Sequence, residues 1–418
     1  MPEILALLQN IAPLVDKTTF RRMSHVLFGM LVASGRITML GLSRWTEKGG
    51  SYRTLQRFYQ SVLPWAALHW VFFRKRFLKP EDDYLIAGDE VVVSKAGQKT
   101  YGLDRFFSGL QQQVIPSLSF FTFALVNIRE EQSYPIQTTQ MVKSAAEKAA
   151  RQAQAKAHKM QKPSDKKKPG RPKGSKNKGK QAVALTPELV RIQTALYTLL
   201  ETVGTVLSLK YVVLDGHFGN YPGAFMVRQA NLHLISKLRS DAALYPAFEG
   251  EHHRRGPKPK YGPKLAVHHL PVKYLKAMSI ENNVRTDIYQ GQFYNKEFAF
   301  ALNVVILLKT NLKTHVQAHV LLFSTDLEQT SDNIIKFYSL RFQIEFNFRD
   351  AKQFWALEDF MNVKETAVTN AANLSFFMDN FSYALVQPFR QSQPDYSILD
   401  LKSCIAQLDL RRKGVEIN

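Results

Sequence analysis

Residues 337–352 read FYSLRFQIEFNFRDAK. Tyr338, Arg341, Glu345 and Lys352 recur at helical spacing, and at about 100° per residue they fall within an arc of roughly 60°. Beside them runs an apolar stripe at helical spacing, formed by Phe337, Ile344, Phe348, Ala351 and Trp355. We predict a single amphipathic helix that buries this stripe and presents the four polar groups on a neighbouring face. A solvated charged face with internal ion pairs is the alternative interpretation.

The composition favours a folded protein that binds nucleic acid. The chain has 418 residues and a formal charge of +21, and 45% of its residues are apolar, which is enough for a substantial core. An aromatic, strongly basic chain of this kind is expected to bind an anionic polymer. Cys404 is the only cysteine, which fits a reducing cytosol. No run reaches the roughly 18 apolar residues of a membrane span, so we expect a cytoplasmic protein.

Residues 1–80 read as a helical domain. Three short helices are predicted, and the last begins after Ser51 and carries Arg53 and Arg57 on one face. A basic helix that follows a tight turn favours a DNA-binding domain of the helix-turn-helix kind. A plain helical bundle with arginines on its surface is the alternative.

Two acids lie on or after predicted buried strands. In residues 82–94, DDYLIAGDEVVVS, both faces are mostly apolar, as in a central strand of an α/β sheet. A carboxylate there, Asp89 or Glu90, needs a partner or a metal ion. Asp215 follows the apolar strand Tyr211–Leu214, and the end of such a strand is a common position for a ligand. Alternatively, Glu90 points to solvent and Asp215 caps the next turn.

Residues 143–180 carry over half of the excess charge. The tract has 14 Lys and Arg residues against two acids, a net charge of +12. Its second half is predicted to be disordered. Its centre, PGRPKG at 169–174, resembles an AT-hook, in which Arg171 and Lys173 would lie in an A·T minor groove. A solvated basic linker that contacts only phosphate is the alternative.

The remaining segments complete an α/β chain. Residues 81–239 hold the first part of the core, 240–328 a β-rich insertion subdomain, 329–365 the helix quoted above, and 366–418 a C-terminal helical region. Strands of the insertion are predicted over the runs Ala266–Lys273, Asn283–Tyr294, Phe298–Thr310 and Ala318–Ser324.

Three acids on such elements of a basic protein point to one chemistry. Asp89, Asp215 and Glu345 together would form a carboxylate site for Mg²⁺, with Mn²⁺ as a substitute, because hard cations prefer oxygen ligands. Two such ions can activate a water or a 3′-hydroxyl for in-line phosphoryl transfer. Arg341 and Lys352 could hold the flanking phosphates, with Arg341 able to do so bidentately.

The spacing Tyr338-x2-Arg341-x3-Glu345-x6-Lys352 resembles the signature of the insertion-sequence-four superfamily of bacterial DDE transposases. The order of the other elements is similar too, since a first Asp on a strand precedes Lys95-x-Gly and a second Asp stands in VLDGHFG at 213–219. The resemblance covers nearly the whole chain except the basic tract.

This resemblance implies a ribonuclease H-like α/β core with Asp89, Asp215 and Glu345 as the Mg²⁺ triad. Tyr338 and Arg341 would contact phosphate at the transposon end, with Lys352 and Lys95 as further DNA contacts. The activity implied is cut-and-paste transposition, with double-stranded DNA as substrate, a homodimer as the synaptic form and the bacterial nucleoid as the site of action. Some relatives close a hairpin on the excised end using an aromatic of the insertion. Here residues 240–328 contain no tryptophan, so the hairpin step stays open.

Two other functions remain as alternatives. One is an inactive DNA-binding or architectural protein descended from a transposase. The other is a ribonuclease H-like nuclease that cuts DNA without strand transfer.

Overall fold

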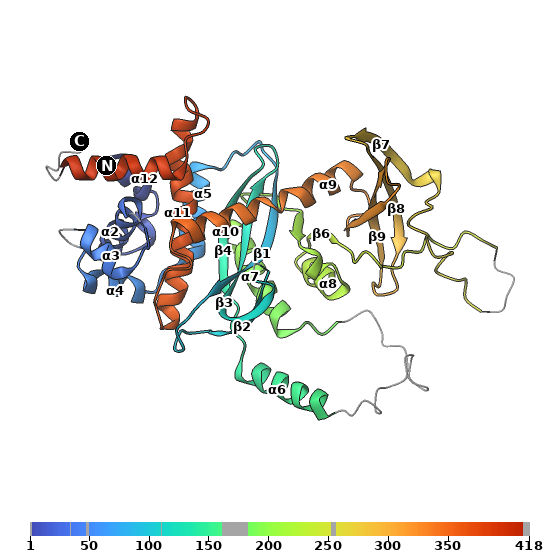
Figure 1. Ribbon diagram of the computed structural model, residues 1–418, viewed down its shortest axis with the longest axis horizontal. Helices are drawn as coiled ribbons and strands as arrows, with labels where there is room; N and C mark the ends of the chain where they lie inside the picture. The colour runs from blue at the N-terminus through green and yellow to red at the C-terminus, as the bar shows by residue number, and fades with distance from the viewer. Residues whose placement is uncertain are drawn as a thin grey trace.

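A ten-stranded mixed sheet runs through the middle of the molecule, with helices at one end and a β-rich extension at the other (Figure 1). The computed structural model describes residues 2–33, 35–46, 50–109, 111–160, 183–251 and 256–412. The strands are β1 (Tyr84–Ser94), β2 (Asp104–Ser108), β3 (Gln113–Asn127), β4 (Gln132–Gln140), β5 (Tyr211–Leu214), β6 (His233–Lys237), β7 (Leu275–Glu281), β8 (Val284–Tyr294), β9 (Ala301–Asn311) and β10 (Gln317–Ser324). Their order is β2-β3-β1-β5-β6-β10-β9-β8-β7, and β4 pairs with β3.

The part of the sheet that carries the predicted acids is consistent with a ribonuclease H-like nuclease. Here β1 pairs in parallel with β5, and β5 with β6, while β3 is antiparallel to both β1 and β4. The predicted strands at 82–94 and Tyr211–Leu214 are confirmed, and the apolar run that begins at Gln113 forms one long strand, β3. The mixed α/β class is therefore as predicted.

Helices gather at the N-terminal end of the chain and on the sheet. They are α1 (Pro2–Gln9), α2 (Lys17–Val32), α3 (Met39–Trp45), α4 (Tyr52–Gln60), α5 (Trp65–Arg76), α6 (Ala145–Met160), α7 (Pro187–Val203), α8 (Tyr221–Gln229), α9 (Ser331–Leu340), α10 (Gln343–Phe354), α11 (Glu365–Arg390) and α12 (Ile398–Arg412). As predicted, α4 begins after Ser51, whose hydroxyl accepts a hydrogen bond from the backbone N–H of Thr54. Within the part of the chain that the structure describes, none of the helices is long and apolar enough to cross a bilayer.

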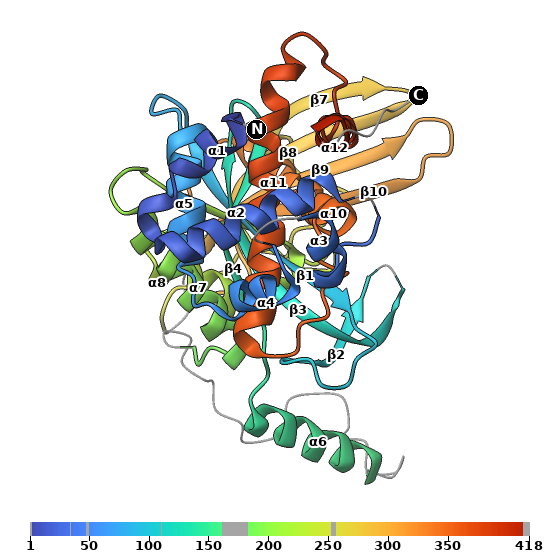
Figure 2. The same cartoon turned by 90° about the vertical axis from the view of Figure 1, so that its left-hand side faces the viewer.

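The C-terminal helices join the N-terminal bundle to the sheet. Helix α12 lies against α2, where the Lys402 ammonium donates to the carbonyl of Met30 at 2.7 Å (Figure 2). Asn370 of α11 donates to the carbonyls of Tyr59 and Ser61 at the end of α4. The N-terminal and C-terminal helices therefore pack as one unit against the part of the sheet that contains β4.

The predicted helix at 337–352 is two helices. The chain leaves α9 at Leu340 and enters α10 at Gln343, and the turn between them closes with short-range bonds: the Phe342 N–H donates to the Ser339 carbonyl and the Ile344 N–H to the Arg341 carbonyl. The prediction of one continuous helix was wrong because its two halves pack in different cores. The α9 stripe lies over β1, β5, β6, β9 and β10, while the α10 stripe packs in the larger core shared with β4 and α11.

One predicted strand of the insertion is also wrong. The run Ala266–Lys273 is irregular, and the strand lies instead at β7, Leu275–Glu281. Pro271 removes a backbone donor and introduces the 3₁₀ turn Val272–Tyr274, so the strand starts after it. The other three predicted runs correspond to β8, β9 and β10. Because β10 pairs with β6, hydrogen bonding is continuous from the core sheet into these strands.

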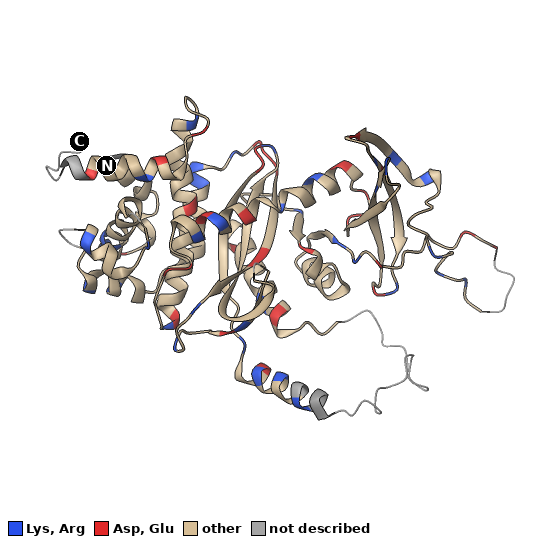
Figure 3. Ribbon diagram, viewed as in Figure 1, with Lys and Arg blue, Asp and Glu red and all other residues tan. Residues whose placement is uncertain are grey.

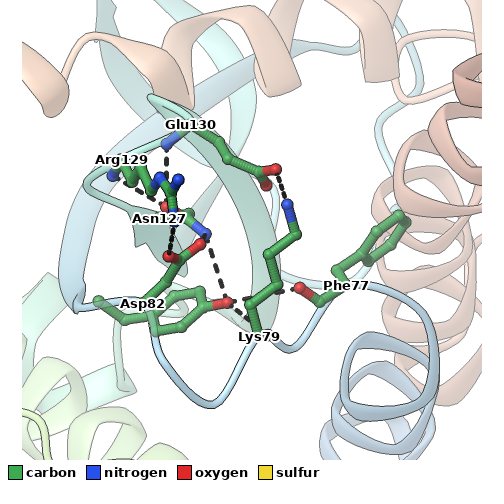
Figure 4. A network of polar contacts seen from close by, with 7 residues as sticks. Phe77, Lys79, Asp82, Asn127, Arg129 and Glu130 are labelled. Carbon is green, nitrogen blue, oxygen red and sulfur yellow. Dashed lines mark hydrogen bonds and ion pairs between the residues drawn. The ribbon is translucent and has the colours of Figure 1, made fainter. Parts of the chain in front are cut away.

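A polar network fixes the start of β1 (Figure 4). The Asn127 amide donates to Asp82 Oδ2 at 2.8 Å, and its carbonyl oxygen accepts from the backbone N–H groups of Arg129 and Glu130. Arg129 Nη1 lies 3.4 Å from Asp82 Oδ1, and Lys79 pairs with Glu130. The network links the segment after α5 to the turn between β3 and β4 and so stabilises the start of β1.

Candidate active site

Two of the predicted acids lie side by side because of strand pairing. Gly88 of β1 pairs with Leu214 of β5, so Asp89 and Asp215 are the next residues on neighbouring parallel strands. A Cβ at Gly88 would lie 2.7 Å from Leu214 Cδ2 and 2.8 Å from Phe123 Cε1, so glycine permits this close packing. Both acids therefore lie at the carboxyl end of the parallel pairing between β1 and β5, which is where open α/β sheets bind ligands.

Side chains alternate between the two faces of β1, so Asp89 and Glu90 lie on opposite faces. Leu85 and Ala87 pack beneath α9, and Asp89 follows them on the same face of the strand. Glu90 lies on the other face, where it is exposed and accepts a hydrogen bond from Ser119 of β3. Asp215 also caps the next turn, since its Oδ1 accepts from the His217 N–H at 3.2 Å. The predicted capping role and a role as a ligand can coexist, because Oδ2 is not used in this bond.

Arg341 joins two of the three acids. Its Nη1 donates to Asp89 Oδ2 at 2.5 Å, and its Nη2 donates to Glu345 Oε1 at 3.2 Å. Glu345, in the first turn of α10, remains 40% exposed, whereas the Arg341 side chain is only 14% exposed. Figure 3 shows basic and acidic residues together on α10. The tight turn between α9 and α10 thus places a guanidinium directly between carboxylates from the sheet and from the helix.

The charges at this site are predominantly negative. Burial raises the pKa of Asp89 to about 6, Arg341 opposes this shift, and the charges of Asp215 and Glu345 add to it. Burial also raises the pKa of Tyr338, whose surroundings include Arg341, Asp215 and Asp89. Three carboxylates with one cation leave a net negative cluster, which is the setting in which a divalent cation binds.

The side chains at this site offer the oxygen ligands that a hard metal ion prefers. A cation already bridges Asp89 and Glu345, since the Arg341 guanidinium lies between them. Among the described residues, no group of three or more His, Cys, Asp and Glu side chains is close enough to hold a metal ion. The oxygen ligands therefore fit Mg²⁺ in kind, and Arg341 occupies the space between two of them.

The two predicted lysines lie further along the sheet. The Lys352 ammonium donates to the Val92 carbonyl at 3.0 Å and lies 3.1 Å from Glu358 Oε1. The Lys95 ammonium donates to the carbonyls of Glu358 and Phe360, and burial lowers the pKa of Lys95 to about 8. Both lysines therefore fasten the segment after α10 to β1, and their contact with DNA stays a prediction.

The N-terminal bundle holds a second candidate surface. Arg53 and Arg57 are exposed on α4, and Arg57 lines a groove of about 1170 Å³ between α1, α2 and α4. The groove also contains basic side chains that the sequence analysis missed, namely Lys17, Arg21, Arg22 and His25 of α2. Their spacing at one helix face was the available signal. The AT-hook-like residues Arg171 and Lys173 lie outside the described residues.

Carboxylates on neighbouring strands of a mixed sheet, one of them linked through an arginine to an acid on a helix, supply oxygen ligands of the kind with which enzymes that cut nucleic acids bind metal ions. A family model described as DDE superfamily endonuclease matches residues 10–291, and the chain belongs to this family. The matched segment includes Asp89 and Asp215, and Glu345 lies beyond it. No curated protein matches the chain. Membership supports a nuclease or transposase that acts on DNA, in a family whose members generally use divalent metal ions.

Proposed function

We propose that the protein is a DNA transposase of the insertion-sequence-four type, which moves an insertion sequence by cut-and-paste transfer. The observation that carries the proposal is the placement of Asp89 beside Asp215 on neighbouring strands, with Arg341 linking Asp89 to Glu345. The spacing of Tyr338, Arg341, Glu345 and Lys352 supports the same assignment. Family membership supplies the coarser function, DNA cleavage.

Each residue has a proposed task. Asp89, Asp215 and Glu345 would hold Mg²⁺, which when bound supplies an activated oxygen nucleophile and stabilises the leaving oxygen. Arg341 would bind a phosphate next to the scissile bond through its two-pronged guanidinium. Tyr338, next to the acids, would donate its hydroxyl to another phosphate oxygen.

DNA binding outside the active site is assigned to the N-terminal bundle. The groove beside α4 combines Arg57 with Arg21, Arg22 and Lys17 of α2 on a concave surface. Lysine and arginine side chains that neutralise phosphates release counterions, so their loss reduces the salt dependence of binding. The bundle would hold the transposon end while the acids act on it.

The test is cleavage of DNA that carries the ends of the element flanking the reading frame. Asp215→Asn should reduce Mg²⁺-dependent cleavage by at least about 10³-fold while DNA binding is retained. Asp241→Asn, which alters an exposed acid paired with Arg239, is the matched control and should cleave normally. Normal cleavage by the Asp215 variant would contradict the assignment of Asp89, Asp215 and Glu345 as the metal ligands.

A nuclease without strand transfer is the second candidate, because the matching family is described by its endonuclease activity. The two functions differ in the fate of the cut end. A transposase joins the freed 3′-hydroxyl to a target duplex, so incubation with a labelled end and a plasmid gives a joined product. Cleavage of DNA that lacks the element ends, with no joined product, would establish the nuclease.

A further inference from the structure

Arg341 contacts two of the three proposed metal ligands. Its two terminal nitrogens each donate to a different carboxylate, Asp89 and Glu345, and the side chain is largely buried. Its Nε is buried and has no hydrogen-bond partner among the described residues. The guanidinium is thus held by its charge and by hydrogen bonds to two carboxylates.

We propose that Arg341 is an internal counter-cation that keeps the acid site closed to metal until a DNA phosphate takes the guanidinium away. This inference rests on the proposed function and concerns its regulation. The oxygens that Arg341 engages, Asp89 Oδ2 and Glu345 Oε1, are among those a metal ion would use. Metal and guanidinium therefore compete for the same ligands.

A phosphodiester is the natural ligand for the displaced side chain. The planar guanidinium matches two phosphate oxygens as well as it matches carboxylate oxygens, and its Nε–H, which is buried without a hydrogen-bond partner among the described residues, becomes available for such a pair when the side chain turns. As the guanidinium turns to the phosphate, the two carboxylates lose their counter-charge and require another cation. Binding of DNA and binding of metal are then coupled, and each must tighten the other by the same factor.

The backbone around Arg341 suits a movable side chain. Between α9 and α10 the helix tightens, with the Phe342, Ile344 and Glu345 N–H groups each bonding to a carbonyl three residues earlier. A short 3₁₀ stretch inside a helical segment often marks a functional hinge. The α9 stripe and the α10 stripe remain buried in separate cores, so the turn can adjust while both helices stay in place.

The experiment measures Mn²⁺ binding to the full chain by the electron paramagnetic resonance signal of free Mn²⁺, without DNA. Arg341→Gln should bind Mn²⁺ at least tenfold more tightly than the wild type, because the competing cation is gone. The matched control is Arg349→Gln, which removes a nearby arginine of α10 that pairs with Asp350. The control should bind Mn²⁺ as the wild type does. Adding Asp89→Asn to Arg341→Gln should abolish the gain.

A short mixed-sequence duplex tests the coupling. In the wild type the duplex should tighten Mn²⁺ binding severalfold, and in Arg341→Gln it should have no such effect. If thermal unfolding shows that Arg341→Gln is not folded, Arg341→Lys replaces it. A lysine can bridge the two acids less well than arginine, so at least threefold tighter Mn²⁺ binding is expected.

Equal or weaker Mn²⁺ binding by folded Arg341 variants would overturn the inference. If the wild type nevertheless cleaves element ends, the proposed function stands and only the competition is lost. If neither the wild type nor the variants bind Mn²⁺, even with the duplex present, the proposed function fails as well. The two failures are therefore distinguishable.

Discussion

Two arginine–carboxylate networks lie on β1 and the residues beside it, and they are built differently. At the start of the strand, Asp82 is almost fully buried, while the Arg129 side chain that pairs with it is 77% exposed. In the middle of the strand the burial is shared, since Asp89 is 20% exposed and Arg341 14% exposed. In the first network the acid, Asp82, is buried and the cation, Arg129, is exposed to solvent. In the second network both Asp89 and Arg341 are largely buried.

The difference appears in the pKa values of the two acids. The pKa of Asp82 is lowered, chiefly by the hydrogen bond from Asn127, so its charged form is stabilised by folding. The pKa of Asp89 is raised to about 6, chiefly by burial, even though Arg341 contacts it. A carboxylate whose pKa is raised by burial despite its hydrogen bonds is typical of a functional site, whereas one whose pKa is lowered by its hydrogen bonds is typical of a structural network.

The largest expected effect separates activity from stability at Asp89. Asp89→Asn should reduce cleavage by at least about 10³-fold, while the midpoint of thermal unfolding at neutral pH stays equal or rises because a buried charge is removed. Cleavage assays and calorimetry of the metal-free protein measure the two quantities. A variant that unfolds and loses activity together would show that Asp89 is structural like Asp82.

Asn127→Ala should have the reverse effect. Asn127 is fully buried and makes hydrogen bonds to Asp82 and to the backbone of Arg129 and Glu130. Its loss leaves these groups unsatisfied, so the free energy of unfolding should fall by about 2–4 kcal/mol. Urea unfolding measures this loss. Cleavage per folded molecule should remain at the wild-type level, and a selective loss of cleavage would contradict the division between the networks.

The pH dependence of stability gives a smaller effect with a defined sign. Because the folded-state pKa of Asp82 lies below its unfolded value of about 3.9, its stabilising contribution is present above that pH. The contribution is lost as the pH falls through the folded-state value. Asp82→Asn should therefore lose less stability than the wild type on acidification below about pH 4. Urea unfolding at several pH values tests this, and parallel curves would contradict it.

The sequence predicted those parts of the fold whose signals are local. The mostly apolar run in 82–94 and the short apolar run before Asp215 indicated β1 and β5, because strands buried on both faces have a strong apolar pattern. The cap at Ser51 gave the start of α4. The pairing of β1 with β5, which brings Asp89 next to Asp215, is a long-range contact that has no local signal in the sequence.

Other features were missed because tertiary packing decides them. Strand β4 has a polar sequence with Pro135 in it, yet it is buried because α5, α10 and α11 cover it. The turn at Arg341 contains neither proline nor glycine, so the break between α9 and α10 has no local signal. The contact between Arg341 and Asp89 joins residues 252 positions apart. Spacing predicted a set of site residues but could not show that Arg341 binds Asp89.

The smallest expected effect lies at the edge of the structural network. Lys79 and Glu130 form an ion pair whose side chains are 44% and 28% exposed. Exposed pairs contribute less than about 1 kcal/mol and are screened by salt. Lys79→Met should therefore lower the free energy of unfolding by less than about 1 kcal/mol, with the difference shrinking further in high salt. Urea unfolding at two salt concentrations measures it. A loss as large as that of Asn127→Ala would mean that the exposed pair, and not the buried amide, stabilises the base of β1, and the contrast between the two networks would then rest on charge rather than on hydrogen bonding.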